Sequence, residues 1–270
     1  MSPSNGHDPV LRHFPAEVPK CTLLVVPGYA DHAGRYTHVG DYFSIRGIDV
    51  YALDLTGHGK APGRRGHIDS FAQYRQDVLS ALKHVTGPEA APVFLLGHSL
   101  GGLIVSSTLL HHKLPLAGVL LSSPFLGLGM PVSPVKATLA MALSKAMPTF
   151  AMPNNIPANH LSRDSTVGEA YLADHLVFRT ATARWFTETL GAMAEVKERV
   201  GEISAPMAIF QAGDERIANK AAVVDFFGRL SGPEKTYTEY PGYYHEILNE
   251  IGKEQVMLDM ALWIEGKIAD

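Results

Sequence analysis

Cysteine is almost absent from this sequence, which contains only Cys21 among its 270 residues. An intrachain disulfide and a cluster of thiolate metal ligands are therefore excluded, and nothing requires an oxidising compartment. An excess of charge of one sign is also lacking, because 23 Lys and Arg residues oppose 27 Asp and Glu residues. Without a basic field to neutralise phosphates, we expect no nucleic-acid partner.

The N-terminus lacks the features of a secretory signal. Residues 1–10 are polar and include Asp8 and two prolines, where a signal requires a basic start and an apolar run. We therefore expect a cytoplasmic protein. A stretch without charged residues does run from Lys113 to Lys136, long enough to raise the question of a membrane span. Four prolines interrupt it, which indicates a β-strand followed by a loop.

The sequence has enough apolar material for a globular core, with 46% hydrophobic and 19% charged residues. Short apolar runs that are typical of strands buried on both faces occur at 22–26, 50–53, 93–96, 118–121 and 207–210. Stretches with helical spacing separate them at 36–46, 71–85, 103–112, 218–230 and 254–268. This alternation predicts an α/β fold with a mostly parallel, doubly wound sheet.

The alternation stops after Ser123 and resumes only at Met207. A gap of this length is too long for an ordinary crossover connection, so we expect an inserted, mostly helical cap. The predicted core comprises residues 1–123 and 201–270, and the predicted cap comprises residues 124–200. Such a cap would cover the carboxyl ends of the strands, where open α/β sheets bind ligands.

The segment Gly97-His98-Ser99-Leu100-Gly101 follows one predicted strand directly and leads into a predicted helix. This strand-turn-helix context is the one that a nucleophile elbow requires. Glycines on both sides of the serine permit a strained turn that side chains would obstruct. We therefore predict Ser99 as a catalytic nucleophile.

A serine hydroxyl needs a base that is oriented by an acid, and in this fold the order along the chain is serine, acid, histidine. Asp214 follows the strand at 207–210, and His245 follows an extended segment at 235–240. We predict His245 as the general base and Asp214 as the acid. Glu215 remains the competing candidate for the acid.

The oxyanion of an acyl-transfer reaction needs hydrogen-bond donors, which are usually backbone amides. The amide of Leu100, immediately after the nucleophile, should supply one. Pro27 has no N–H and Gly28 lets the chain turn, so Tyr29 should supply the second. No spacing of histidines and carboxylates resembles a metal site, and we predict an enzyme without cofactor or metal.

Several segments together resemble the monoacylglycerol lipase and lysophospholipase branch of the α/β hydrolases. They are PGYADHAGRY (27–36), LDLTGHG (53–59), RGHI (65–68), GHSLG (97–101), LSRD (161–164) and YPGYYHE (240–246). The resemblance implies Ser99, Asp214 and His245 as the triad and the amides of Tyr29 and Leu100 as the oxyanion hole. Pro27 and the bulky Tyr29 depart from the family pattern, as do Lys60 and Ala61. These departures bear on substrate fit more than on the chemistry.

The expected function is cleavage of carboxylic esters of single long-chain lipids through an acyl-enzyme, with monoacylglycerol as the favoured substrate. Lysophospholipids, short-chain or xenobiotic esters, and a non-catalytic ligand-binding protein remain as alternatives. We expect the apolar part of the cap, around Phe125, Leu139 and Leu143, to bind the acyl chain. The alternative for this segment is packing as core. The same apolar cap would allow transient, peripheral contact with a membrane or micelle surface.

Overall fold

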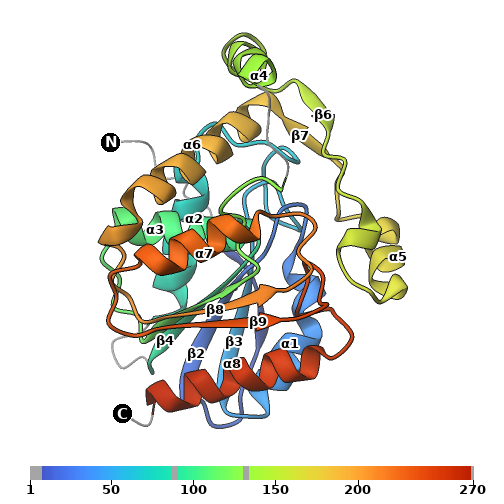
Figure 1. Ribbon diagram of the computed structural model, residues 1–270. Coiled ribbons are helices and arrows are strands. Elements are labelled where there is room, and N and C mark those ends of the chain that lie inside the picture. The colour runs from blue at the N-terminus through green and yellow to red at the C-terminus, as the bar shows by residue number, and fades with distance from the viewer. Residues whose placement is uncertain (1–7, 87–90, 130–133, 269–270) are drawn as a thin grey trace.

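A computed structural model describes residues 8–86, 91–129 and 134–268 of the chain. Its centre is a sheet with the strand order β1-β3-β2-β4-β5-β8-β9 (Figure 1). All neighbouring strands run parallel except β1 and β3, which are antiparallel. The strands are β1 (Val10–Phe14), β2 (Cys21–Val26), β3 (Ile48–Asp54), β4 (Val93–His98), β5 (Gly118–Ser122), β8 (Met207–Ala212) and β9 (Lys235–Tyr240).

Helices cover both faces of this sheet, and the central strands are buried on both sides. On β2, Leu24 and Val26 belong to one hydrophobic cluster, whereas Leu23 and Val25 belong to the other. This alternation follows from the two-residue period of a strand. The first cluster is shared with α2 (Ala72–Val85), α3 (Leu100–His111), α6 (Ala183–Arg199) and α7 (Lys220–Arg229). The second is shared with α1 (Thr37–Ser44) and α8 (Lys253–Ile268).

Each strand and helix predicted from the apolar patterns is present, with ends that move by a few residues. The structure adds β1, which the sequence analysis did not identify. This strand pairs along its whole length with β3 at one edge of the sheet. It exposes Arg12 and His13 to solvent, so its sequence lacks the continuous apolar run that marks the buried strands.

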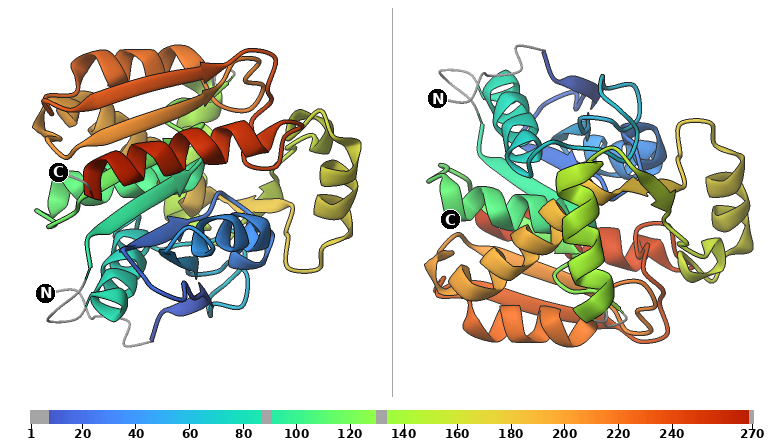
Figure 2. Two further views of the ribbon diagram at one scale, coloured as in Figure 1. Left: turned by 90° about the horizontal axis from the view of Figure 1, so that it is seen from below. Right: turned by 90° about the horizontal axis from the view of Figure 1, so that it is seen from above.

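In its described part, the chain between β5 and β8 contains three α-helices, two short 3-10 helices and a small antiparallel pair of strands. The α-helices are α4 (Pro134–Ala146), α5 (Ser165–Ala173) and α6, and the strands are β6 (Ala151–Pro153) and β7 (Thr180–Thr182). In Figures 1 and 2, α4 and α5 lie apart from each other at the periphery of the molecule. Within the described ranges, no helix is both long enough and apolar enough to cross a membrane.

Helix α6 differs from the rest of this segment because it is part of the core. Trp185, Met193 and Val196 are buried in the same cluster as α2 and α3. Helix α4 in turn packs on α6, where Ser144 Oγ lies 2.7 Å from Thr187 Oγ1. The predicted cap at 124–200 therefore includes one helix that supports the sheet, together with outer elements that do not.

Candidate active site

Ser99 occupies a strained turn between β4 and α3. Its backbone has φ 51° and ψ −117°, a conformation that costs a non-glycine residue on the order of 1–3 kcal/mol. The turn is tight enough that a side chain on Gly97 would press on the backbone of Gly101, and one on Gly101 would collide with the Val26 carbonyl. The glycines of the motif are therefore required sterically, as the sequence analysis expected.

His245 lies in the loop between β9 and α8, and its Nε2 is 2.8 Å from Ser99 Oγ. The ring is buried. Backbone hydrogen bonds fix the loop on both sides of it, since Tyr244 N donates to the Glu250 carboxylate and Glu246 N donates to the Leu161 carbonyl. The base is therefore held in place by the core and by the segment that contains Leu161.

Glu215, and not Asp214, orients His245, so the prediction for the acid is wrong. Both carboxylate oxygens of Glu215 lie within 2.9 Å of His245 Nδ1. Asp214 is exposed, and its backbone N–H donates to the Tyr243 carbonyl. The chain turns immediately after β8, and of these two neighbours it is Glu215 whose side chain reaches the imidazole.

Further hydrogen bonds hold the Glu215 carboxylate, which accepts from the backbone N–H groups of Ile217 and Ala218. Burial opposes its charge, but His245 and these amides outweigh burial and lower the pKa of Glu215 to about 2. Burial likewise opposes charge on His245, and the Glu215 carboxylate outweighs it and raises the pKa of His245 above its usual value. The Glu215 carboxylate therefore stabilises the protonated form of His245 through its contact with Nδ1.

The loop after β2 lies directly beside the nucleophile. A Cβ on Gly28 would be 3.3 Å from the Ser99 Cβ. In the part of the chain that the structure describes, the backbone N–H groups of Tyr29 and Leu100 have no protein acceptor. Leu100 also begins α3, where the helix dipole favours negative charge. Both predicted oxyanion donors are thus unoccupied amides close to Ser99.

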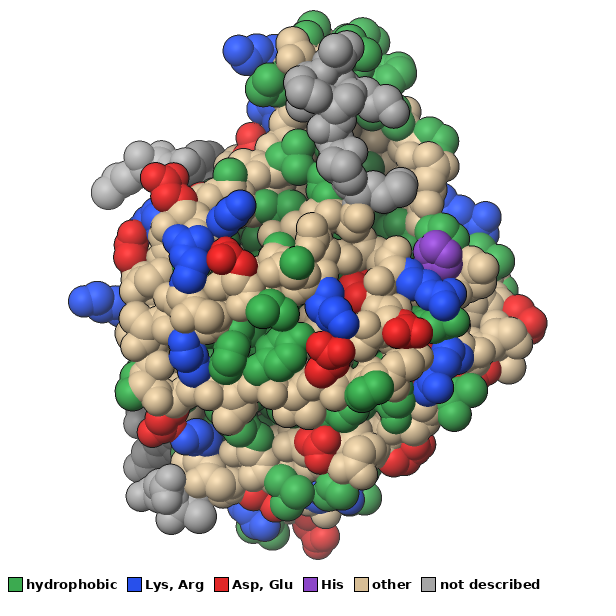
Figure 3. Space-filling model, in the orientation of Figure 1, with side chains coloured by type: hydrophobic (Ala, Val, Ile, Leu, Met, Phe, Trp, Pro, Cys, Tyr) green, Lys and Arg blue, Asp and Glu red, His purple; other side chains and the backbone are tan. Residues whose placement is uncertain are grey.

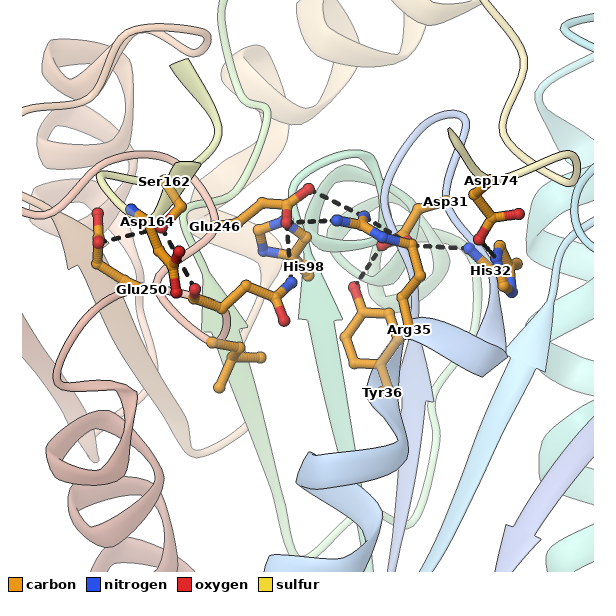
Figure 4. Close-up of polar contacts among 12 residues, drawn as sticks. Asp31, His32, Arg35, Tyr36, His98, Ser162, Asp164, Asp174, Glu246 and Glu250 are labelled. Carbon is orange, nitrogen blue, oxygen red and sulfur yellow. Dashed lines mark hydrogen bonds and ion pairs between the residues drawn. The ribbon is translucent and has the colours of Figure 1, made fainter. Parts of the chain in front are cut away.

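A buried ion network lies next to His245 (Figure 4). Arg35 donates to both carboxylate oxygens of Glu246 at 2.9 and 2.7 Å and to Asp31 at 3.1 Å. Tyr36 Oη donates to Asp31 at 2.8 Å. His98 lies near this network, and burial together with His245 lowers its pKa to about 4. His98 is therefore neutral at physiological pH.

A small pocket that is partly open to solvent adjoins Ser99. Its apolar wall consists of Ile156, Leu161, Tyr171 and Ile217. Its polar wall consists of Asp31, His98, Ser99, His245 and Glu246. Across the described residues, no group of three or more His, Cys, Asp or Glu side chains is placed to hold a metal ion.

None of the described residues that line this pocket is one that was predicted to bind the acyl chain. Phe125 packs against the core beneath it. Leu139 lies on α4 with 59% of its surface exposed, and Leu143 is half-buried on the same helix. Of the apolar residues that do line it, Ile156 and Leu161 lie between β6 and α5, Tyr171 lies in α5, and Ile217 lies between β8 and α7.

Sequence reasoning did not assign roles to Glu246 and Glu250. Glu250 is a buried carboxylate that accepts from Tyr244 N, Arg163 N and Ser162 Oγ, as Figure 4 shows for Ser162. It ties the Leu161-Ser162-Arg163-Asp164 segment to the loop of His245. The sequence did contain a signal for these two roles, because Glu246 and Glu250 are carboxylates in the short stretch between His245 and the following helix.

The matches to known proteins agree with this architecture. The family described as "Serine aminopeptidase, S33", a hydrolase family, matches residues 17–252. The chain belongs to this family. It is 31% identical to a monoacylglycerol lipase of Mycolicibacterium smegmatis over 91% of this chain and 88% of the relative. It is 30% identical to a phospholipase of Bacillus subtilis over 89% of this chain and 93% of the relative.

Solved structures place the chain among the α/β hydrolases. The crystal structure of a monoacylglycerol lipase from Paleococcus ferrophilus superposes with a TM-score of 0.88 and 26% identity, covering 97% of this chain and all of the other. A monoglyceride lipase from Saccharomyces cerevisiae, in complex with a substrate analogue, superposes with a TM-score of 0.84. At 20% identity over 99% of both chains, this second likeness shows the fold alone. The predicted fold class and the family resemblance are thus confirmed.

Proposed function

We propose that the protein is a serine ester hydrolase in which Ser99, His245 and Glu215 form the catalytic triad. The observation that carries the proposal is the continuous chain of hydrogen bonds from Ser99 Oγ through both nitrogens of His245 to Glu215. A nucleophile, a base and an acid in this order are the requirements of acyl transfer.

In the proposed reaction, His245 Nε2 takes the proton of Ser99 as Oγ bonds to the ester carbonyl carbon. The tetrahedral oxyanion accepts hydrogen bonds from the amides of Tyr29 and Leu100, each worth about 3 kcal/mol in the transition state. The C–O bond to the alcohol then breaks, and the imidazolium returns the proton to that oxygen. Water repeats the sequence on the acyl-enzyme, which releases the carboxylic acid and restores Ser99.

We propose monoacylglycerol as the substrate, cleaved to fatty acid and glycerol. The 31% identical relative carries that name. The pocket also favours a neutral polar head, because its formally charged lining residues are the carboxylates Asp31 and Glu246. No lysine or arginine is among the described residues that line it. The apolar wall offers an acyl chain about 0.8 kcal/mol for each methylene that it buries.

A lysophospholipid is the second candidate, and the 30% identical relative, named a phospholipase, favours it. Its phosphodiester would bring a negative charge toward Asp31 and Glu246. The partial neutralisation of these carboxylates by Arg35 reduces that cost. The two candidates therefore differ in head-group charge, which an assay can compare directly.

The cap also provides an apolar surface for contact with lipid aggregates. Exposed hydrophobic side chains gather on and after α4, at the top of Figure 3. They are Leu139, Met141, Met147, Phe150 and Met152. An exposed group of this kind is typical of a surface that rests on a membrane or micelle. It would give the enzyme access to lipid esters by peripheral contact.

A fluorophosphonate probe and a hydrolysis panel test the proposal. We expect the probe to label the wild type and not Ser99→Ala, because only an activated serine reacts readily. The panel compares a C12–C18 monoacylglycerol, the matching lysophospholipid and triacylglycerol, and p-nitrophenyl esters of C2–C4 acids. Labelling of Ser99→Ala would refute the nucleophile. Highest kcat/KM on triacylglycerol, on the lysophospholipid or on the short esters would refute monoacylglycerol as the substrate.

A further inference from the structure

The side chain of Tyr29 leaves the loop beside Ser99 and enters a group of rings between the core and the cap. Its ring centroid lies 4.0 Å from that of Trp185, 5.3 Å from Phe178 and 5.7 Å from His58. We call these four rings the aromatic cluster. Contacts at these separations are favourable for tilted and edge-to-face pairs.

The aromatic cluster joins elements that are distant in the sequence. Tyr29 follows β2, His58 follows β3, Phe178 precedes β7 and Trp185 lies in the first turn of α6. His58 is uncharged there, since burial outweighs the hydrogen bond from its Nδ1 to the Thr56 carbonyl and lowers its pKa to about 4. The cluster is therefore an apolar junction between the core and the returning cap strand.

One hydrogen bond attaches Tyr29 to the cap strand itself. The Tyr29 hydroxyl donates to the Thr180 carbonyl of β7 at 2.6 Å. Burial raises the pKa of Tyr29, which keeps the hydroxyl protonated. Gly66 leaves the necessary room, because a Cβ at this residue would collide with both the Thr180 carbonyl and the Tyr29 hydroxyl. The Tyr29 side chain is thus held at its ring and at its tip.

We infer that Tyr29 is a positioning residue, whose side chain fixes the backbone amide of the same residue in the oxyanion hole. The inference rests on the proposed function. Gly28 immediately precedes this amide, so the loop itself has little intrinsic stiffness. The aromatic cluster and the bond to Thr180 supply the missing restraint. The position of the cap strand is thereby coupled to the oxyanion hole.

Such a role predicts an effect on the transition state and not on substrate binding. A donor that is displaced or mobile loses part of its interaction with the oxyanion, while the ground-state ester is little affected. The loss should be equal for a C4 ester and for a long-chain monoacylglycerol, because both form the same oxyanion. A side chain that only supported the cap would instead affect the long-chain substrate more.

The experiment compares Tyr29→Phe and Tyr29→Ala with the control Tyr74→Phe. The Tyr74 hydroxyl accepts from Trp185 Nε1 at 3.1 Å, so its removal also breaks one hydrogen bond, at the border of the aromatic cluster. Tyr74 lies in α2, outside the aromatic cluster, and no hydrogen bond among the described residues joins it to the loop of Tyr29. Thermal unfolding of each variant reports the purely structural effect.

Three readouts follow for each variant: kcat, KM and the affinity of a trifluoromethyl ketone, whose hemiketal oxygen occupies the oxyanion hole. We expect kcat and inhibitor affinity to fall together, about 2- to 5-fold in Tyr29→Phe and about 10- to 100-fold in Tyr29→Ala. KM should stay within about 2-fold. Tyr74→Phe should keep wild-type kcat and inhibitor affinity, with a melting temperature lowered about as much as in Tyr29→Phe.

Equal kinetic effects in Tyr29→Phe and Tyr74→Phe would overturn the inference, as would a loss confined to long-chain substrates or to KM. Should Tyr29→Ala fail to fold, Tyr29→Phe still decides the matter against its control. Failure of the proposed function gives a different result. A wild type that neither reacts with a fluorophosphonate nor hydrolyses any ester would overturn both proposals, whereas an active wild type with unaffected Tyr29 variants overturns this one alone.

Discussion

The core side of the active site and its cap side are built differently. On the core side, the Ser99 turn is enclosed by backbone from two strands and a helix, and the Val26 carbonyl leaves no space for a side chain at Gly101. On the cap side, polar side-chain contacts outside the aromatic cluster connect the cap to the core, such as His32 to Asp174. The comparison suggests that the core sets the chemistry and the cap sets the substrate.

This difference has an energetic basis. The conformation of Ser99 is unfavourable by itself, and close packing of β2, β4 and α3 maintains it. Contacts of the cap are partly exposed hydrogen bonds, which contribute on the order of 0.5–1.5 kcal/mol each. Core substitutions should therefore change turnover of every ester alike, whereas cap substitutions away from the contact of Tyr29 with Thr180 should change discrimination among esters.

The largest expected effect is on the core side, at the acid. Glu215→Gln should lower kcat by about 10⁴-fold for short and long esters alike, since the amide cannot stabilise the imidazolium. Asp214→Asn should stay near the wild type, because that side chain is exposed and away from His245. Steady-state kinetics on a C4 ester and a monoacylglycerol measure both.

Asp214→Asn and Glu215→Gln serve as matched controls for each other, since each change replaces a carboxylate with the corresponding amide. If Asp214→Asn were inactive and Glu215→Gln active, the acid would be the one predicted from the sequence. If the Glu215→Gln loss depended strongly on chain length, the separation of core and cap functions would break down.

The pH profile provides the next largest effect. His245 must be neutral to accept the proton, and Glu215 raises its pKa, so kcat/KM should rise through an inflection above pH 6.5. Below that inflection, the rate should fall about tenfold per pH unit. In Glu215→Gln the charge is lost while the burial remains, so the inflection of the residual activity should move to lower pH than in the wild type. An inflection that stays in place would contradict the coupling of the pair.

Core residues were predictable from the sequence because their constraints are local. Buried parallel strands require continuous apolar runs, and the elbow requires glycines around Ser99, so both patterns appear in consecutive residues. The choice between Asp214 and Glu215 was not predictable, because both follow the same strand. It depends on how the chain turns after β8, which hydrogen bonds from Ile217 and Ala218 to Glu215 determine.

Cap residues were harder to predict because their contacts are long-range. The apolar composition of 125–157 indicated hydrophobic contacts but not their direction, and Leu139 points to solvent. Ile156 and Leu161 reach the pocket only through the path of the chain between β6 and α5. No periodicity in that segment marks them, since most of it is irregular.

A smaller effect is expected on the cap surface. Leu139→Glu combined with Met141→Glu should lower kcat/KM about 10-fold on micellar long-chain monoacylglycerol, since charge opposes insertion into a lipid surface. A soluble C4 ester should be hydrolysed as by the wild type. Both residues are more than half exposed, so folding should not change.

The control places one charge on the core, in Val224→Glu, where α7 exposes 50% of the side chain. It should leave both activities unchanged. Equal loss on micellar and soluble esters in the α4 variant would indicate damage to the site and would contradict the surface role.

The smallest expected effect concerns the contact between His32 and Asp174. His32 Nδ1 accepts from Gly34 N, so Nε2 carries the proton that is donated to Asp174 at 2.8 Å (Figure 4). Asp174→Ala removes the acceptor, and its partly exposed position limits the loss to about 2- to 5-fold in kcat/KM for long-chain esters. Asp174→Asn keeps an acceptor oxygen and should stay closer to the wild type. If Asp174→Ala instead lowered kcat on the C4 ester by 100-fold, this cap contact would control the chemistry, and the division between core and cap would be wrong.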